Sequence, residues 1–294
     1  MSKKLEYLQE VVEFQFNNDL SKGINHLELL TDSLFKLTQS LFDYKVKPAY
    51  HLRELEGKYF RFGLANQSII QLIKGNRFRL LGNDVIIPDI FSFKSLTRMQ
   101  IESYLIMHYL FFENVSEEEK DFRYDIYKVH ALQKQMGFKI NFDTQIAREN
   151  RLKIQKELNQ ALENIKKNSI YCCASEKEKK EYLKPRFPKL TSSKNLFESS
   201  GLSKAGFNQM WQLYSNYAHA EHISDRQYNT TYNIKKSFTE DSSLILIINL
   251  ILTSKLIVNI TKLFDGAKIE FEKLSEKEKV IVDIWFNLKN KNVK

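Results

Sequence analysis

A stripe of uncharged polar side chains is the feature of this sequence best suited to chemistry. It consists of Asn208, Gln212, Ser215, His219 and His222. These residues are spaced by four, three, four and three positions along one predicted helix. Side chains at this spacing share one face of a helix. A solvated face of this protein would carry Lys and Glu, so amide, hydroxyl and imidazole groups indicate a hydrogen-bonded network or a pocket wall.

Two predicted helices are poor in charge. The window 207–222 holds one charged residue, Glu221, and the window 95–112 holds two, Arg98 and Glu102. Charged residues make up 28% of the chain, a share that would place about four in a window of sixteen. Both helices are therefore predicted to be buried on most sides.

Arg98 and Glu102 are spaced i, i+4 and so share one helical face. Because an unpaired buried charge costs several kcal/mol, both residues are expected to have partners. They form either an internal salt bridge that stabilises the bundle or a pair that lines a functional cleft. We expect them to converge with the polar stripe. The candidate catalytic residues are Arg98, Glu102, Ser215 and His219. The candidate binding residues are Tyr127, Gln212, Tyr214, Asn216 and His222.

Two other chemistries fit the late helix less well. His219 and His222 could share a metal ion with Glu102, but no Glu-x-x-His pair accompanies them, so we predict no metal and no cofactor. Ser215 precedes His219 by one turn, yet a nucleophilic serine normally sits on a strained turn beside an oxyanion hole. The sequence has no Gly-rich phosphate loop, dinucleotide-binding fingerprint or kinase signature.

The elements that position these residues are predicted to be helices. The 294 residues include only 9 Gly and 4 Pro, too few for the turns of a sheet protein. Apolar residues recur at helical spacing, which predicts an all-α bundle of about eight helices, a single helical domain over 1–294 and more than about 60% helix. The predicted helices are 1–22, 26–44, 57–78, 95–112, 117–136, 143–169, 203–222, 237–265 and 276–288.

Several local signals refine these boundaries. Asp143 and Ser203 are predicted N-caps, and Ser275 with Glu278 predicts a capping box. A short extended piece is predicted at 85–87. The apolar run Leu244–Ile260 is shorter than the ~20 residues of a spanning helix, so we interpret it as a core helix and predict no membrane partner.

Two segments are predicted to lie outside the bundle. The stretch 176–200 contains Pro185, Pro188 and an excess of Lys and Arg, which predicts a basic loop and the first site of proteolysis. The tail 289–294 is basic and predicted to be frayed.

Charge and cysteine content suggest partners and a compartment. The formal net charge of +9 indicates either a nucleic-acid surface or generic surface charge from an AT-rich genome, since Lys outnumbers Arg and Asn is abundant. We therefore name RNA or a protein as the partner, with a homodimer as one form of the latter. Cys172 and Cys173 are adjacent and form neither a disulfide framework nor a zinc site, and no apolar signal core follows Met1, so a cytoplasmic location is expected.

Three motifs in this order resemble a widespread bacterial helical family of unknown function. They are Arg98-Met-Gln-Ile-Glu102, Arg123-Tyr-Asp-Ile-Tyr-Lys128 and Tyr214-Ser-Asn-Tyr-Ala-His219. That family carries an Arg-x-x-x-Glu helix and a Tyr-x-x-Ser-x-x-x-His-like helix, and the resemblance extends roughly over residues 25–265.

The late helix also resembles the signature helix of the HEPN superfamily, helical bundles that include RNA-cutting toxins and antiphage effectors. Those enzymes pair an arginine with a polar residue and a histidine. Ser215, Asn216 and His219 fit the later positions, whereas Leu213 and Tyr214 precede them without an arginine. Arg98 from the other helix is the candidate to supply the guanidinium.

Two classes of function follow. The leading one is a module that binds a ligand or a partner through the polar cluster, in a bacterial defence or stress system. The alternative, implied by the resemblance, is a HEPN-like metal-independent ribonuclease. His219 would then assist proton transfer and Arg98 would stabilise the pentavalent phosphate. Whether the chain is an enzyme stays open at the level of sequence.

Overall fold

The protein is all-α, as predicted. The structure is a computed structural model, and it describes residues 3–17, 19–138, 144–202, 206–219, 221–233 and 235–288. These residues form fourteen α-helices, two short turns of other helix types and one small sheet, and the chain is 80% helical. The expected number of about eight helices was too low, because separate helices that were not predicted form at Ser169–Cys172, Glu176–Leu183, Ser193–Ser199, His222–Asn233 and Asp265–Lys273.

The chain packs as two compact units, a division that the prediction of a single domain did not foresee. Unit 1 comprises Met1–Lys47, Glu54–Leu105 and Gly201–Lys294, and unit 2 comprises Pro48–Arg53 and Ile106–Ser200. The helices of unit 1 are α1 (Lys3–Asn17), α2 (Leu20–Asp43), α3 (Leu55–Lys74), most of α4 (Ile90–Met107), α10 (Gly206–Ala218), α11 (His222–Asn233), α12 (Lys235–Leu263), α13 (Asp265–Lys273) and α14 (Glu276–Asn287). Unit 2 contains η1 (Tyr50–Leu52), η2 (His108–Phe112), α5 (Glu117–Gly137), α6 (Gln145–Lys167), α7 (Ser169–Cys172), α8 (Glu176–Leu183) and α9 (Ser193–Ser199).

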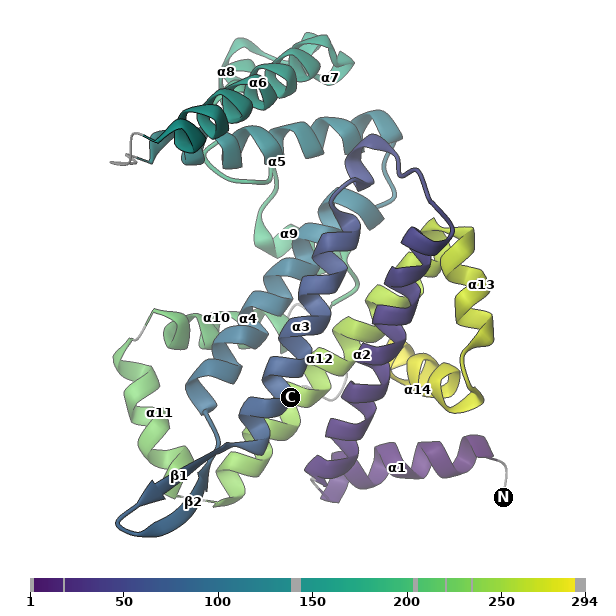
Figure 1. Cartoon of the computed structure of the whole chain (residues 1–294), viewed down its shortest axis with the longest axis vertical. Helices are drawn as coiled ribbons and strands as arrows, with labels where there is room; N and C mark the ends of the chain where they lie inside the picture. The colour runs from purple at the N-terminus through teal and green to yellow at the C-terminus, as the bar shows by residue number, and fades with distance from the viewer. Residues whose placement is uncertain are drawn as a thin grey trace. The chain divides into compact units, whose positions relative to one another are not determined.

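The core of unit 1 is built on α2 and α12, which pack along each other with α3 beside α2 (Figure 1). The apolar residues of α2 recur at three- and four-residue spacing, and Leu27, Leu30, Leu34 and Leu37 are all fully buried. Since each turn of α2 presents an apolar group to its neighbours, its periodicity predicted both the helix and its buried face.

Helix α12 is the most apolar element of the chain. By length and composition Phe238–Leu263 could cross a membrane, the one such stretch among the described residues, and 67% of its most apolar window is buried inside the protein. Its buried side chains pack in unit 1 against α2, α13 and α14, among other helices. The prediction of a core helix at Leu244–Ile260 is confirmed.

A polar network runs through this apolar core. The Asn66 amide donates to Thr31 Oγ1 at 3.1 Å and to Thr253 Oγ1 at 2.9 Å, and its carbonyl oxygen accepts from Gln100 Nε2 at 2.9 Å. All four side chains are fully or almost fully buried. Because buried polar groups must find partners, the network fixes α2, α3, α4 and α12 in one relative register.

A β-hairpin interrupts the helices of unit 1. Strands β1 (Asn76–Leu80) and β2 (Asn83–Ile87) pair antiparallel, with Phe78 opposite Val85. The extended piece predicted at 85–87 is confirmed. The prediction of helix to residue 78 was wrong, because Gly75 ends α3 at a φ of +87°, where a Cβ atom would lie 2.8 Å from Ile86 Cγ2.

Unit 2 is organised around α5 and α6. Apolar side chains of α5, among them Ile126 and Val129, pack against Ala161 and Ile165 of α6. Helix α8 covers this layer, where the Tyr182 and Phe122 rings make an edge-to-face contact at 5.1 Å.

The prediction of a basic loop over 176–200 was wrong for most of its length. Ser175 and Glu178 form a capping box that starts α8, and α9 buries Leu196 and Phe197. Within 176–200, only 184–192 and the C-cap Ser200 lie outside these two helices. These helices were not predicted because they are short and contain few apolar residues, so no helical periodicity stands out in this Lys-rich stretch.

The cap predictions have different outcomes. The capping box of Ser275 and Glu278 at the start of α14 is confirmed. Helix α6 is capped by the Thr144 side chain, which accepts from the Ala147 amide, while the predicted caps Asp143 and Ser203 lie outside the described residues. The predicted tail 289–294 also lies outside them.

Candidate functional site

Arg98 connects the two charge-poor helices. It projects from α4, and its Nε donates to Ser215 Oγ on α10 at 2.8 Å. Its Nη2 donates to Glu102 Oε1, one turn further along α4, at 2.9 Å. Three residues predicted to converge therefore do meet, and the guanidinium beside Ser215 comes from α4.

Trp211 completes this arrangement. Its indole Nε1 donates to Glu102 Oε1 at 3.1 Å, and the Arg98 guanidinium carbon lies 5.8 Å from the centre of its ring. The Ser215 hydroxyl in turn donates to the Trp211 carbonyl oxygen at 3.0 Å. We call Arg98, Glu102, Trp211 and Ser215 the Arg98 site.

The Arg98 site is less buried than the lack of charge suggested. The side chain of Arg98 is 20% exposed and that of Glu102 is 41% exposed. The prediction that both helices are buried on most sides was therefore wrong at these positions. The solvent-facing part of α10 carries uncharged polar groups, so a count of charged residues overestimated its burial.

His219 lies beside the site but does not join its hydrogen bonds. Its backbone N–H donates to the Ser215 carbonyl oxygen at 3.1 Å, so the helical turn continues to this residue. The imidazole is exposed and has no hydrogen bond or ion pair with any described residue. Of the four residues expected to cluster, Arg98, Glu102 and Ser215 do so, whereas His219 is exposed one turn away.

The candidate binding residues are scattered. Gln212 and His222 are exposed, and the Asn216 amide donates to the carbonyl oxygens of Gln212 and Leu213. Tyr214 is buried, its hydroxyl has no hydrogen-bond partner among the described residues, and burial raises its pKa well above the ordinary value. Tyr127 belongs to unit 2, whereas the stripe belongs to unit 1. The stripe is therefore not one buried network.

Lys94 forms a second polar contact on α4 that the sequence analysis missed. It is 2% exposed, and its Nζ donates to Asp241 Oδ2 at 2.6 Å and to the Tyr217 hydroxyl at 3.0 Å. Lys94 precedes Arg98 by one helical turn, so the two cations share a face of α4. The charge-poor window began at residue 95, one position too late to include it.

The Arg98 guanidinium retains the capacity to bind an anion. Of its five N–H groups, two are used by Ser215 and Glu102, and the other three have no partner among the described residues. A planar guanidinium whose orientation is fixed by two bonds presents its remaining donors in a set direction. Ser215, Glu102 and the Trp211 ring hold the Arg98 guanidinium in this way.

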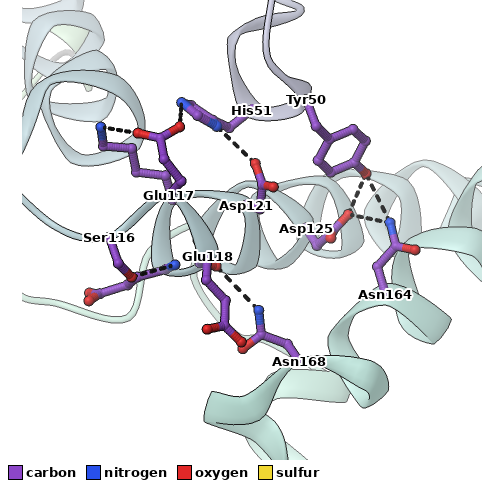
Figure 2. Close-up of polar contacts among 11 residues, drawn as sticks. Tyr50, His51, Ser116, Glu117, Glu118, Asp121, Asp125, Asn164 and Asn168 are labelled. Carbon is purple, nitrogen blue, oxygen red and sulfur yellow. Dashed lines mark hydrogen bonds and ion pairs between the residues drawn. The ribbon is translucent and has the colours of Figure 1, made fainter.

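Unit 2 contains a separate polar cluster along one face of α5 (Figure 2). His51 of η1 makes a hydrogen bond through Nδ1 to Asp121 at 2.8 Å, and its Nε2 lies 3.6 Å from Glu117. The imidazole is buried. These contacts fasten the short segment 48–53 to α5, which is why a stretch so distant in sequence belongs to unit 2.

Asp125 lies on the same face of α5 and is also buried. Its Oδ1 accepts from the Tyr50 hydroxyl at 2.5 Å and from Asn164 Nδ2 of α6 at 3.4 Å (Figure 2). Burial raises the pKa of Asp125 to about 6, against the lowering effect of Tyr50 and Asn164, and burial beside Asp125 raises the pKa of Tyr50. Three elements therefore meet at a carboxyl group that takes up a proton near neutral pH.

The raised pKa of Asp125 predicts how the free energy of unfolding depends on pH. The pKa of Asp125 is higher in the folded protein, so the folded state binds a proton first as the pH falls from 7 to 5. The free energy of unfolding should then rise by about 1 kcal/mol more in the native protein than in Asp125→Asn. Thermal unfolding of both proteins followed by circular dichroism at the two pH values measures this difference. An equal pH response of the two proteins would show that Asp125 does not titrate in this range.

Comparison with known proteins gives no match. No protein-family model, no curated protein and no solved structure matches this sequence. The resemblance to a bacterial helical family and to the HEPN signature helix therefore stands on the sequence motifs alone. By its geometry, the chain is an all-α protein in which Arg98 of α4 donates a hydrogen bond to Ser215 of α10.

Proposed function

We propose that this protein is a binding module whose Arg98 site takes a ligand through a phosphate group. The observation that carries the proposal is the Arg98 guanidinium, which is held by Ser215 and Glu102 with three N–H donors left over. Because Arg98 is one-fifth exposed, a ligand can reach those donors from solvent.

The groups around Arg98 favour a phosphate over a carboxylate. A phosphate offers three oxygens to several donors at once, and a planar guanidinium matches two of them. On α10, the exposed residues Gln212 and His219 are spaced about one turn before and one turn after Ser215, so an amide and an imidazole share its helical face. The Glu102 carboxylate repels an anion, so the phosphate is expected to bind the N–H groups of Arg98 that Glu102 and Ser215 do not use.

A metal-independent ribonuclease is the second candidate, and one observation favours it. Arg98 is bonded to Ser215, one turn before His219, so an arginine and a histidine flank one serine in space although no arginine precedes it in sequence. In that reaction a ribose 2′-hydroxyl attacks the adjacent phosphorus and the bond to the 5′-oxygen breaks. His219 would move the proton and Arg98 would bind the phosphoryl oxygens.

Binding of inorganic pyrophosphate, measured by calorimetry, tests the proposal. We expect saturable binding, about 100-fold weaker in Arg98→Ala and about tenfold weaker in Arg98→Lys, because lysine keeps the charge but loses the fork. Arg79→Ala is the matched control, since Arg79 is an exposed arginine of unit 1 whose side chain has no hydrogen bond or ion pair with any described residue. It should bind like the native protein.

The same variants separate the two candidate functions. A single-stranded RNA is incubated with the native protein, Arg98→Ala and His219→Ala. Cleavage that both substitutions abolish would make the chain a ribonuclease. Pyrophosphate binding without RNA cleavage supports the binding module. No binding at millimolar pyrophosphate, or equal binding by native protein and Arg98→Ala, would contradict it.

A further inference from the structure

Unit 2 contains a large groove. It lies between the C-terminal half of α5 and the N-terminal half of α6, two helices that run along each other (Figure 1), and Pro188 borders it. Its volume is about 1640 Å³. Tyr127, predicted from the sequence as a binding residue, is one of its lining residues.

The lining of the groove combines aliphatic and cationic side chains. Ile106, Leu132, Met136 and Ile154 are among the aliphatic and thioether groups. The cations Lys134, Arg151 and Lys153 have no hydrogen bond or ion pair with any described residue. Glu157 is the single acidic residue of the lining, so the positive charge of the groove is not balanced within it.

The size of the groove decides what kind of occupant it fits. Small-molecule sites have volumes of roughly 300–1,000 Å³, and this groove exceeds that range. A groove between two helices that is open to solvent accommodates one face of a third helix, whose apolar side chains enter at i, i+3, i+4 and i+7. The cations of its lining that have no partner among the described residues select a helix with acidic side chains.

We propose that this groove docks an acidic amphipathic helix of a partner protein. Side chains such as Leu and Ile of that helix contact the aliphatic lining, and its Asp and Glu residues pair with Lys134, Arg151 and Lys153. The proposal is independent of the Arg98 site, which lies in unit 1.

The same cations could attract RNA, but the rest of the lining favours a helix. Proteins that bind single-stranded RNA present aromatic platforms on which bases stack. The aromatic lining residues other than His130 are Tyr127 and Phe138, whereas aliphatic residues come from both helices. An aliphatic surface recovers more free energy from Leu and Ile side chains than from bases.

Fluorescence anisotropy with a labelled synthetic helix tests the proposal. The probe is a peptide of about 18 residues with Leu at i, i+3, i+4 and i+7 and Glu elsewhere, and a scrambled peptide of equal composition is its control. We expect binding of the first at micromolar concentration, weakening as salt is raised, and at least tenfold weaker binding of the second.

Two matched pairs of variants locate the binding. The double variant Arg151→Glu/Lys153→Glu should weaken peptide binding at least tenfold. The control Lys177→Glu/Lys194→Glu reverses two exposed charges of unit 2 outside the groove and should leave peptide binding unchanged. Ile146 and Leu152 are each 71% exposed on α6, but only Ile146 lines the groove. Ile146→Ser should therefore weaken binding several-fold and Leu152→Ser should not, with both proteins folded.

Three results would overturn the proposal. The first is no difference between the amphipathic and the scrambled peptide. The second is an equal effect of Ile146→Ser and Leu152→Ser, which would place the peptide elsewhere. The third is tight binding of a single-stranded RNA, lost in Arg151→Glu/Lys153→Glu, together with no peptide binding, which would make the groove a nucleic-acid site.

Discussion

Replacing Asp241 by alanine should lower the free energy of unfolding of unit 1 by about 3–5 kcal/mol. The carboxylate of Asp241 lies 2.6 Å from the Nζ of Lys94, whose side chain is almost completely buried. Without Asp241 the ammonium group keeps, among the described residues, only the Tyr217 hydroxyl as its hydrogen-bond partner. An ammonium buried without its counter-ion is one of the costliest defects that a single substitution can create.

Urea denaturation followed by tryptophan fluorescence measures this effect. The chain has two tryptophans, Trp211 and Trp285, and both belong to unit 1, so their emission reports that unit. Asp32→Ala is the control, because Asp32 is an exposed acidic residue of α2 without a partner among the described residues. It should change stability by less than about 0.5 kcal/mol.

A double variant distinguishes the buried charge from other causes. Adding Lys94→Met to Asp241→Ala removes the unpaired cation and should restore most of the lost stability. If the double variant is as unstable as the single one, the loss comes from packing and not from the charge.

The second large effect is expected at Asn66. Asn66→Ala removes three buried hydrogen bonds, to Thr31, Thr253 and Gln100, and leaves a cavity, so unit 1 should lose about 3–4 kcal/mol. Thr253→Val removes one of these acceptors while keeping the volume and should cost about 1 kcal/mol. The same fluorescence measurement applies. Equal costs for the two variants would contradict the prediction, because Asn66 would then contribute no more than its single bond to Thr253.

The network of Asn66 also affects the Arg98 site. Gln100 donates to Asn66, and Thr97 accepts from the Asn249 amide at 3.1 Å, so one face of α4 is fixed in the core. Arg98 and Glu102 lie on the face that meets α10. Because the buried face sets the rotation of α4, it also sets the direction in which Arg98 points.

The fold could be predicted largely from periodicity and caps. The spacing of Leu27, Leu30 and Leu34 predicted a buried helical face, and Ser275 with Glu278 marked the start of α14. The division into two units could not be predicted, because it depends on contacts such as that of His51 with Asp121, which are 70 residues apart in the chain. Sequence patterns carry no information on such pairings.

The site could be predicted in part. The i, i+4 spacing placed Arg98 and Glu102 together, and the polar stripe indicated Ser215 as their neighbour. The role of Trp211 was not foreseen, because a tryptophan in a helix is typical of an apolar contact, and only the structure shows that its indole N–H donates to Glu102. Lys94 was missed because a buried lysine looks in sequence like a solvated one, and only its distance to Asp241 identifies it.

Tryptophan fluorescence gives the most direct test of the proposed phosphate site. Trp211 contacts both Glu102 and Arg98, and Trp285→Phe leaves it as the single tryptophan of the chain. Titration of this variant with inorganic pyrophosphate should change the Trp211 emission saturably, and adding Arg98→Ala should abolish the change. An emission that stays constant to millimolar pyrophosphate, or that changes equally without Arg98, would contradict the account.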